Sequence, residues 1–208
     1  MTLVKICGIN SPAALDAAVE AGADYIGFVF FPASPRYVTP AEAAALSARH
    51  EGAKPLRVGL FVNPGFDEID AVLQQVSLDV LQIHASPSLI APLRDRFGRP
   101  VWRQLGVSTA ADFPAADEFA DGYVVEAKPP PGATRPGGNA VQADWHLLAH
   151  VRPAKPWLLA GGLRRENVAE ALRVTGAPGV DVSSGVETAP GQKSPELIRQ
   201  FIAAARAG

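Results

Sequence analysis

The short apolar run Leu3-Val4-Lys5-Ile6-Cys7 stops at Gly8 and sets a pattern that the rest of the chain repeats. Runs of this length that are rich in Val, Ile and Leu are typical of strands covered on both faces. Further runs of the same kind follow, and their starts lie 21 to 35 residues apart, the length of one strand plus one helix. We expect strands at 3–7, 24–30, 56–62, 79–84, 101–105, 122–126, 157–160 and 179–183.

Most of the segments between these runs have the pattern of helices. The first is the best marked, because Ser11 can cap its amino end and Pro12 suits the first helical position. The helical pattern is weak around 109–118 and 144–150. We expect helices at 12–21, 40–48, 66–76, 88–97, 165–174 and 195–205.

This alternation predicts an α/β protein whose parallel strands are joined by helical crossovers. Eight such units favour a single (β/α)8 barrel over residues 1–208, near the lower end of the usual size range for that fold. A doubly wound open sheet gives the same alternation and is the second interpretation. No linker divides the chain, and the Pro- and Gly-rich stretch 129–138 is interpreted as one long loop after a strand.

Composition limits the possible functions. A net charge of −2 and a pI of about 6.1 do not suggest a nucleic-acid or anionic-membrane binder. The amino terminus lacks the basic and apolar segments of a signal peptide, and no apolar run approaches the ~20 residues that span a bilayer. One cysteine allows no internal disulfide. We therefore expect a cytoplasmic protein, as a monomer or a homodimer, that binds neither nucleic acid nor membrane.

The lone cysteine lies at the carboxyl end of the first strand. A free cysteine is most often buried and inert. However, strand alternation places Lys5 and Cys7 on one face, and burial of Val4 and Ile6 against the helices directs that face into the barrel. An ammonium beside the thiol is then expected to favour the thiolate.

Other strands also carry polar side chains near their carboxyl ends, where barrel enzymes build their active sites. Such groups are costly inside a barrel unless they are paired or functional. The pairs that share a face are Gln82 with His84, Val124 with Glu126, and Asp181 with Ser183.

Two segments predict a phosphate site. The stretch 158–163 carries Gly161 and Gly162 after the seventh strand, and paired glycines let backbone amides approach an anion. The stretch 182–186 carries Ser183 and Ser184 after the eighth strand and is expected to open a short helical turn. Barrel phosphate sites are often formed by these two loops.

Two further features bear on ligand binding. Arg36 lies between prolines in the loop after the second strand, where a guanidinium suits an anionic ligand, although a surface arginine is the plain alternative. His146 and His150 are four residues apart, but no acidic or cysteine partner accompanies them, so no metal site is expected.

Taken together, these residues resemble the phosphoribosylanthranilate isomerase family, cofactor-free (β/α)8 enzymes of tryptophan biosynthesis. The resemblance covers nearly the whole chain. The segments that carry it are 5–9, 27–30, 34–36, 82–84, 159–168 and 179–187, which read Lys-Ile-Cys-Gly-Ile, Gly-Phe-Val-Phe, Ser-Pro-Arg, Gln-Ile-His, Leu-Ala-Gly-Gly-Leu-Arg-Arg-Glu-Asn-Val and Gly-Val-Asp-Val-Ser-Ser-Gly-Val-Glu.

The resemblance implies an Amadori rearrangement of a small phosphosugar, N-(5-phosphoribosyl)anthranilate, without a cofactor. It implies that Cys7 is the general base, that the residue at the position of Glu126 is the general acid, and that Arg36 binds the anthranilate carboxylate. His84 and Asp181 are implied as lesser polar contacts. The implied phosphate ligands are Gly161, Gly162, Ser183 and Ser184.

One position departs from the family pattern. The acid is usually an aspartate, whereas this chain has Glu126, whose carboxyl group lies one methylene further out. A displacement near 1 Å can cost about 10²-fold where geometry is critical. We expect the backbone or a bent Glu126 side chain to compensate, because Asp121 lies at the wrong end of its strand to substitute.

Two alternatives stay open at this stage. Another ribose-phosphate barrel, similar to indole-glycerol-phosphate synthase, would share the phosphate loops but has no use for the thiol of the first strand. The second alternative is a phosphosugar-binding barrel without catalytic activity, in which Glu126 in place of the usual aspartate reflects the loss of catalysis. The stretch 129–139 is expected to contribute to a lid over the site.

Overall fold

A computed structural model describes residues 1–50, 52, 55–114, 119–127, 145–149 and 153–207. Eight parallel strands form a closed barrel in which each is hydrogen-bonded to the next and β8 returns to pair with β1. This confirms the predicted (β/α)8 class and excludes the open sheet. The barrel strands are β1 (Leu3–Cys7), β2 (Tyr25–Val29), β3 (Leu56–Val62), β4 (Val80–His84), β5 (Val101–Val107), β6 (Gly122–Ala127), β7 (Trp157–Leu159) and β8 (Gly179–Val182).

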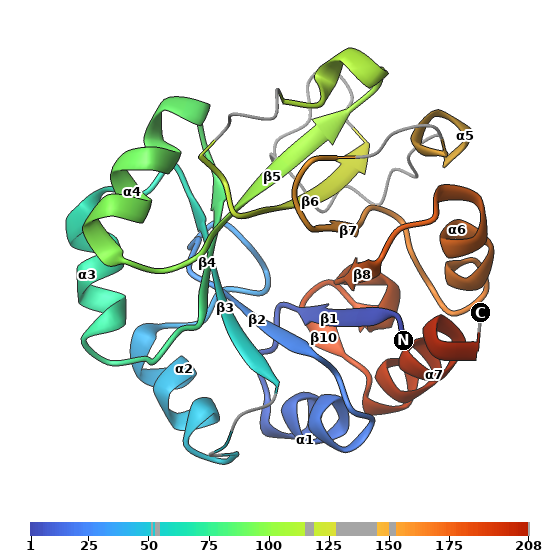
Figure 1. Ribbon diagram of the computed structural model, residues 1–208. Helices are drawn as coiled ribbons and strands as arrows, with labels where there is room; N and C mark the ends of the chain where they lie inside the picture. The colour runs from blue at the N-terminus through green and yellow to red at the C-terminus, as the bar shows by residue number, and fades with distance from the viewer. Residues whose placement is uncertain (51, 53–54, 115–118, 128–144, 150–152, 208) are drawn as a thin grey trace.

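The helices lie outside the ring of strands (Figure 1). The carboxyl-terminal helix α7 contacts both α1 and α6, so the last helix completes the outer layer beside the first. The helices are α1 (Pro12–Glu20), α2 (Pro40–Ser47), α3 (Phe66–Leu73), α4 (Ile90–Phe97), α5 (Trp145–Leu148), α6 (Val168–Thr175) and α7 (Pro195–Ala207), with 3₁₀ turns η1 (Pro87–Leu89), η2 (Ala110–Asp112) and η3 (Ser184–Val186).

Local sequence accounts for several helix ends. Ser11 caps α1 by accepting a hydrogen bond from the Ala14 amide, and Pro12 occupies the first turn, as predicted. At α2, Thr39 and Glu42 form a reciprocal capping box. The predicted helices at 66–76 and 88–97 are shorter than expected, because α3 ends at Leu73 and a 3₁₀ turn precedes α4.

A pair of short strands was not predicted. After η3 the chain forms a small antiparallel hairpin of β9 (Glu187–Ala189) and β10 (Gln192–Lys193), outside the barrel sheet. In the segments whose helical pattern is weak, 109–118 and 144–150, the structure has η2 and the single turn α5, while 115–118, 144 and 150 lie outside the described residues.

Candidate active site

A pocket opens at the carboxyl ends of the barrel strands. The space within it is about 890 Å³ when the open mouth and its solvent are included. All of the predicted site residues line it, so the structure brings together side chains from both ends of the sequence. These are Cys7, Arg36, His84, Glu126, Gly161, Gly162, Asp181, Ser183 and Ser184.

The first strand delivers a thiol and an ammonium to the same place. Val4 and Ile6 are fully buried in the apolar core, so Lys5 and Cys7 share the inward face as expected. A Cβ built on Gly27 of β2 would lie 3.2 Å from Cys7 Sγ and 3.3 Å from Lys5 Nζ. The absence of that methyl group therefore makes room for both side chains.

Lys5 is completely buried, and its Nζ donates to Asp181 Oδ1 at 2.8 Å. Burial alone would lower the pKa of Lys5, but the Asp181 carboxylate and Cys7 outweigh it and raise the pKa above its ordinary value. The ammonium form is therefore held beside the thiol. Asp181, predicted as a substrate contact, is first of all the counter-ion of Lys5.

The expectation that Lys5 favours the Cys7 thiolate needs correction. Burial raises the pKa of the Cys7 thiol above its ordinary value, and this effect exceeds the lowering by the Lys5 ammonium. Asp181 also raises it. The attraction that the sequence predicted is present, but desolvation of the thiolate outweighs it.

Two glutamines on neighbouring strands form a series of side-chain hydrogen bonds that ends at Glu126. Gln82 Nε2 of β4 donates to Gln104 Oε1 of β5 at 2.7 Å, and Gln104 Nε2 donates to Glu126 Oε1 of β6 at 2.8 Å. Glu126 is 7% exposed, so its carboxyl group is held at the wall of the pocket rather than in solvent. Gln82 Oε1 is buried without a hydrogen-bond partner among the described residues, which leaves an acceptor at that wall.

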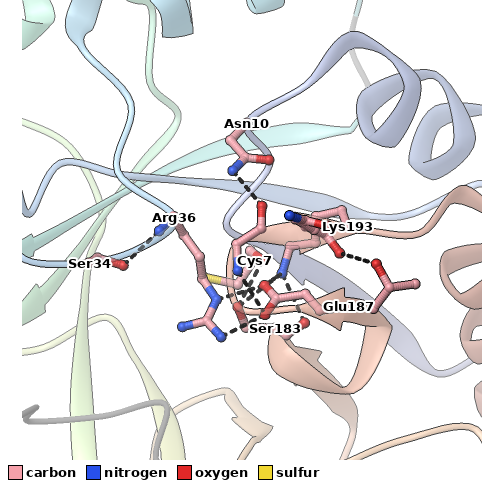
Figure 2. A network of polar contacts seen from close by, with 10 residues as sticks. Cys7, Asn10, Ser34, Arg36, Ser183, Glu187 and Lys193 are labelled. Atoms are coloured by element: carbon pink, nitrogen blue, oxygen red, sulfur yellow. Dashed lines mark hydrogen bonds and ion pairs between the residues drawn. The ribbon is translucent and has the colours of Figure 1, made fainter.

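Arg36 is held by an ion pair that the sequence pattern did not reveal. Its Nε and Nη2 donate to the two carboxylate oxygens of Glu187 at 2.7 and 2.9 Å. Lys193 Nζ also donates to Glu187 Oε1, at 2.7 Å, and to the Ser183 backbone oxygen at 2.9 Å. Ser183 Oγ in turn donates to the Cys7 backbone oxygen at 3.2 Å, and Figure 2 shows the whole network.

The two predicted phosphate loops pack directly on each other. Gly161 and Gly162 have positive φ angles of 87° and 65°, which turn the backbone sharply after β7. A Cβ on Gly185 would lie 1.9 Å from the Leu163 oxygen, so only glycine allows the loop after β8 to lie this close. Ser184 begins the predicted helical turn, η3.

His84 ends β4 at the edge of the pocket. Burial lowers the pKa of its imidazole, so the neutral form is favoured near pH 7. A neutral imidazole can both donate and accept a hydrogen bond, which suits a polar ligand contact.

Asp121 is not among the residues that line this pocket. The Asp121 carboxylate accepts a hydrogen bond from the Val101 amide at 2.9 Å, at the amino end of β5, as expected of a residue at the wrong end of the barrel. The stretches 129–138 and 129–139, and His150, the second histidine of the pair with His146, lie outside the described residues.

Comparison with known proteins decides the family. The family model described as N-(5'phosphoribosyl)anthranilate (PRA) isomerase matches residues 4–204. The chain belongs to this family. It is 53% identical to an N-(5'-phosphoribosyl)anthranilate isomerase of Acidiphilium cryptum, with 100% of both chains covered. It is 54% identical to that of Paracoccus denitrificans, with 98% of this chain and 97% of the other covered.

Solved isomerase structures agree with the fold. The phosphoribosyl anthranilate isomerase from Thermotoga maritima superposes with a TM-score of 0.84 at 34% identity, over 100% of both chains. A phosphoribosyl anthranilate isomerase in complex with reduced 1-(o-carboxyphenylamino)-1-deoxyribulose 5-phosphate superposes with a TM-score of 0.83, also at 34% identity and over 100% of both chains. Within the described part of this isomerase-family chain, no helix has the length and apolar character needed to cross a membrane.

Proposed function

We infer that the chain isomerises N-(5-phosphoribosyl)anthranilate to 1-(2-carboxyphenylamino)-1-deoxyribulose 5-phosphate, in tryptophan biosynthesis. Family membership over residues 4–204 is the observation that carries this conclusion. The pocket supports it, because a thiol, a carboxyl group, an arginine and two glycine- or serine-rich loops converge there. The reaction moves hydrogen atoms within one molecule, so the residues that line the pocket suffice for acid and base chemistry.

In the proposed first step Glu126, in its acid form, protonates the furanose ring oxygen. The C1–O bond breaks as the anthranilate nitrogen lone pair forms a protonated Schiff base at C1. Cys7 thiolate then removes the proton from C2, the electron pair of that C–H bond forms the C1–C2 double bond of an enolamine, and the π pair of the C1–N bond returns to nitrogen. Tautomerisation of the enolamine gives the ketone. An acid and a base that act in this way each contribute about 10²- to 10⁴-fold in rate.

Other residues hold the two ends of the substrate. We propose that Arg36 binds the anthranilate carboxylate and that Gly161, Gly162, Ser183 and Ser184 bind the phosphate through backbone amides and hydroxyls. His84 and Asp181 are proposed as polar contacts between these ends. The free acceptor on Gln82 suits a ribose hydroxyl, because a buried carbonyl without a donor is otherwise costly.

The test is turnover of chemically generated phosphoribosylanthranilate, followed by its loss of fluorescence. The parent protein should turn over. Cys7→Ser should lower kcat by about 10²- to 10⁴-fold, while binding of a stable phosphosugar analogue persists. Near-full turnover by Cys7→Ser would remove Cys7 from the mechanism. Absence of turnover by the parent, with analogue binding retained, would favour the non-catalytic barrel.

Three broader features are also proposed. The chain forms one domain over 1–208, works in the cytoplasm, and is a monomer or a homodimer. The phosphoribosylantranilate isomerase of Thermotoga maritima is dimeric, and monomers of it have been generated. Light scattering of the purified protein during size-exclusion chromatography distinguishes the two assemblies, and a larger oligomer would contradict both.

A further inference from the structure

The hairpin that follows the barrel lies against the loop that carries Arg36. Gly191, between β9 and β10, has a φ of +79°, and a Cβ there would lie 2.2 Å from the Pro35 backbone oxygen. Asn10 Nδ2, from the loop after β1, donates to the Gly191 oxygen at 2.9 Å. The hairpin is therefore fixed between the loops that follow β1 and β2.

Glu187 occupies one edge of the Arg36 guanidinium. Nε and Nη2 meet the two oxygens of Glu187, which uses two of the five N–H donors of an arginine. The end-on edge, formed by Nη1 and the second Nη2 hydrogen, is geometrically separate from this contact and can hold another carboxylate in bidentate fashion. Arg36 lines the pocket, whereas Glu187 is not among the residues that line it.

Lys193 holds Glu187 from the other side (Figure 2). Its side chain is fully buried, and its Nζ lies 2.7 Å from Glu187 Oε1 and 3.1 Å from Ser183 Oγ. Glu187 Oε2 also accepts from the Gly191 amide at 3.3 Å. Glu187 thus has partners on both oxygens and little freedom to rotate, so it can fix the plane of the guanidinium.

We propose that Glu187, held by Lys193, is a positioning residue that presents the end-on edge of Arg36 to the ring carboxylate and so sets the preference for a carboxylated substrate. This rests on the proposed function of Arg36. Glu187 itself does not touch the substrate. Its contribution is to order a long side chain before the ligand arrives, which spares that ordering cost at binding.

The sharpest test compares two ligands on one protein. The reduced product, 1-(2-carboxyphenylamino)-1-deoxy-pentitol 5-phosphate, and its counterpart made from aniline differ only in the ring carboxylate. The parent should bind the carboxylated ligand more tightly. Glu187→Gln should weaken it by about tenfold or more, because an oriented charge-assisted pair is lost, and leave the aniline ligand within about threefold.

The ratio of the two dissociation constants separates positioning from folding. Both ligands are titrated into the same preparation, so partial unfolding cancels in the ratio. Glu187→Asp keeps the charge but moves it away by one methylene, so it should reduce the preference for the carboxylated ligand over the aniline ligand. This variant serves as the test if Glu187→Gln is too unstable to purify. Glu20→Gln is the matched control, since Glu20 pairs with Arg199 on the exposed outer helices and should leave the ratio unchanged.

A double-mutant cycle for turnover completes the test. Glu187→Gln alone should raise KM by about tenfold with kcat changed less than about threefold, and should add less than about twofold in an Arg36→Gln background. Equal weakening of both ligands, or full additivity with Arg36→Gln, would overturn the positioning role. An inactive parent would instead contradict the proposed function, so the two failures are distinguishable.

Discussion

The reactivity of Cys7 is set by two opposing effects. Burial raises the pKa of its thiol, and the ammonium of Lys5 lowers it, with burial the larger. The base in the proposed mechanism is the thiolate. The fraction of active base therefore grows as the pH rises toward the thiol pKa.

This balance predicts a pH dependence. Because Glu126 acts in its acid form and Cys7 acts as the thiolate, the pH profile of kcat/KM for the parent should contain one limb for each group, and the limb set by the Cys7 thiol should lie above the ordinary range of a thiol pKa. Lys5→Met removes the ammonium, so the pKa of Cys7 should rise further and the profile should move to higher pH. Initial rates measured by fluorescence from pH 6 to 10 check this.

The control for that shift is Lys155→Met, at the opposite end of the barrel before β7, which should leave the profile in place. Lys5→Met leaves the buried Asp181 without its counter-ion, at a cost of about 3–5 kcal/mol. The double variant Lys5→Met with Asp181→Asn relieves this and should shift the profile in the same direction, because Lys5 has the larger influence on the pKa of Cys7. If the parent, Lys5→Met and the double variant had superimposable pH profiles, Lys5 would have no influence on the pKa of Cys7.

The proposed role of Glu126 as the general acid predicts how substitutions at Glu126 and at its partner Gln104 change kcat. Glu126→Gln should lower kcat by about 10²- to 10⁴-fold, while Glu126→Asp keeps substantial activity. Gln104→Leu removes the donor to Glu126 Oε1 and should lower kcat by about tenfold in the parent but not in Glu126→Gln. Gln75→Leu, on the exposed surface after α3, is the control. Parent-like turnover by Glu126→Gln would rule out Glu126 as the acid.

The strands and most helices could be predicted from regular sequence patterns, but contacts between residues far apart in the sequence could not. Runs such as 3–7 and 56–62 match their strands to the residue, because a buried parallel strand needs continuous apolar side chains. The hairpin at Glu187–Lys193 was missed because two- and three-residue strands show no periodicity. The pairing of Arg36 with Glu187 joins positions 151 residues apart, and one sequence holds no signal for such a contact.

The predicted site shows the same division. Strand alternation placed Cys7 and Glu126 in one pocket, because the carboxyl ends of parallel strands meet at one rim. It did not predict the net direction of the pKa shift of Cys7, which depends on how completely the closed barrel excludes water. The hydrogen bond from Gln104 to Glu126 depends on side-chain torsions that strand periodicity does not specify.

The hairpin yields a prediction at the scale of elements. Gly191→Ala puts a methyl group against the Pro35 oxygen and strains a positive φ, so the hairpin should move away from the loop that carries Arg36. KM should rise by about tenfold, since a displacement near 1 Å can cost up to about 10²-fold. Gly98→Ala is the matched control, because its φ of +59° carries the same backbone strain in open space. Both variants should lose about 1–2 kcal/mol of stability from that strain, but only Gly191→Ala should change KM.

The seam between β8 and β1 closes the barrel by joining its last strand to its first. Leu3 pairs with Gly179, Val4 with Val180 and Lys5 with Asp181. The same seam places the Lys5–Asp181 ion pair beneath the pocket. Closure of the barrel and assembly of the site therefore depend on the same contacts, and a defect at the seam should affect both.

Gly179 is the position at which this dependence can be tested. A Cβ there would lie 2.6 Å from Leu158 Cδ2 and 2.7 Å from the Leu3 oxygen, so Gly179→Ala must push β8 away from both neighbouring strands. We expect a loss of about 1–3 kcal/mol, with Tm lower by roughly 2–4 °C for each kcal/mol. Because a closed barrel offers no free edge at which part of the sheet can separate first, calorimetry should show one transition whose van't Hoff and calorimetric enthalpies agree. Gly65→Ala, which meets nothing within 4 Å, should lose less. Two resolved transitions in the parent would contradict the single domain proposed for residues 1–208. An unchanged Tm for Gly179→Ala would show that β8 can move away from its neighbours without loss of stability.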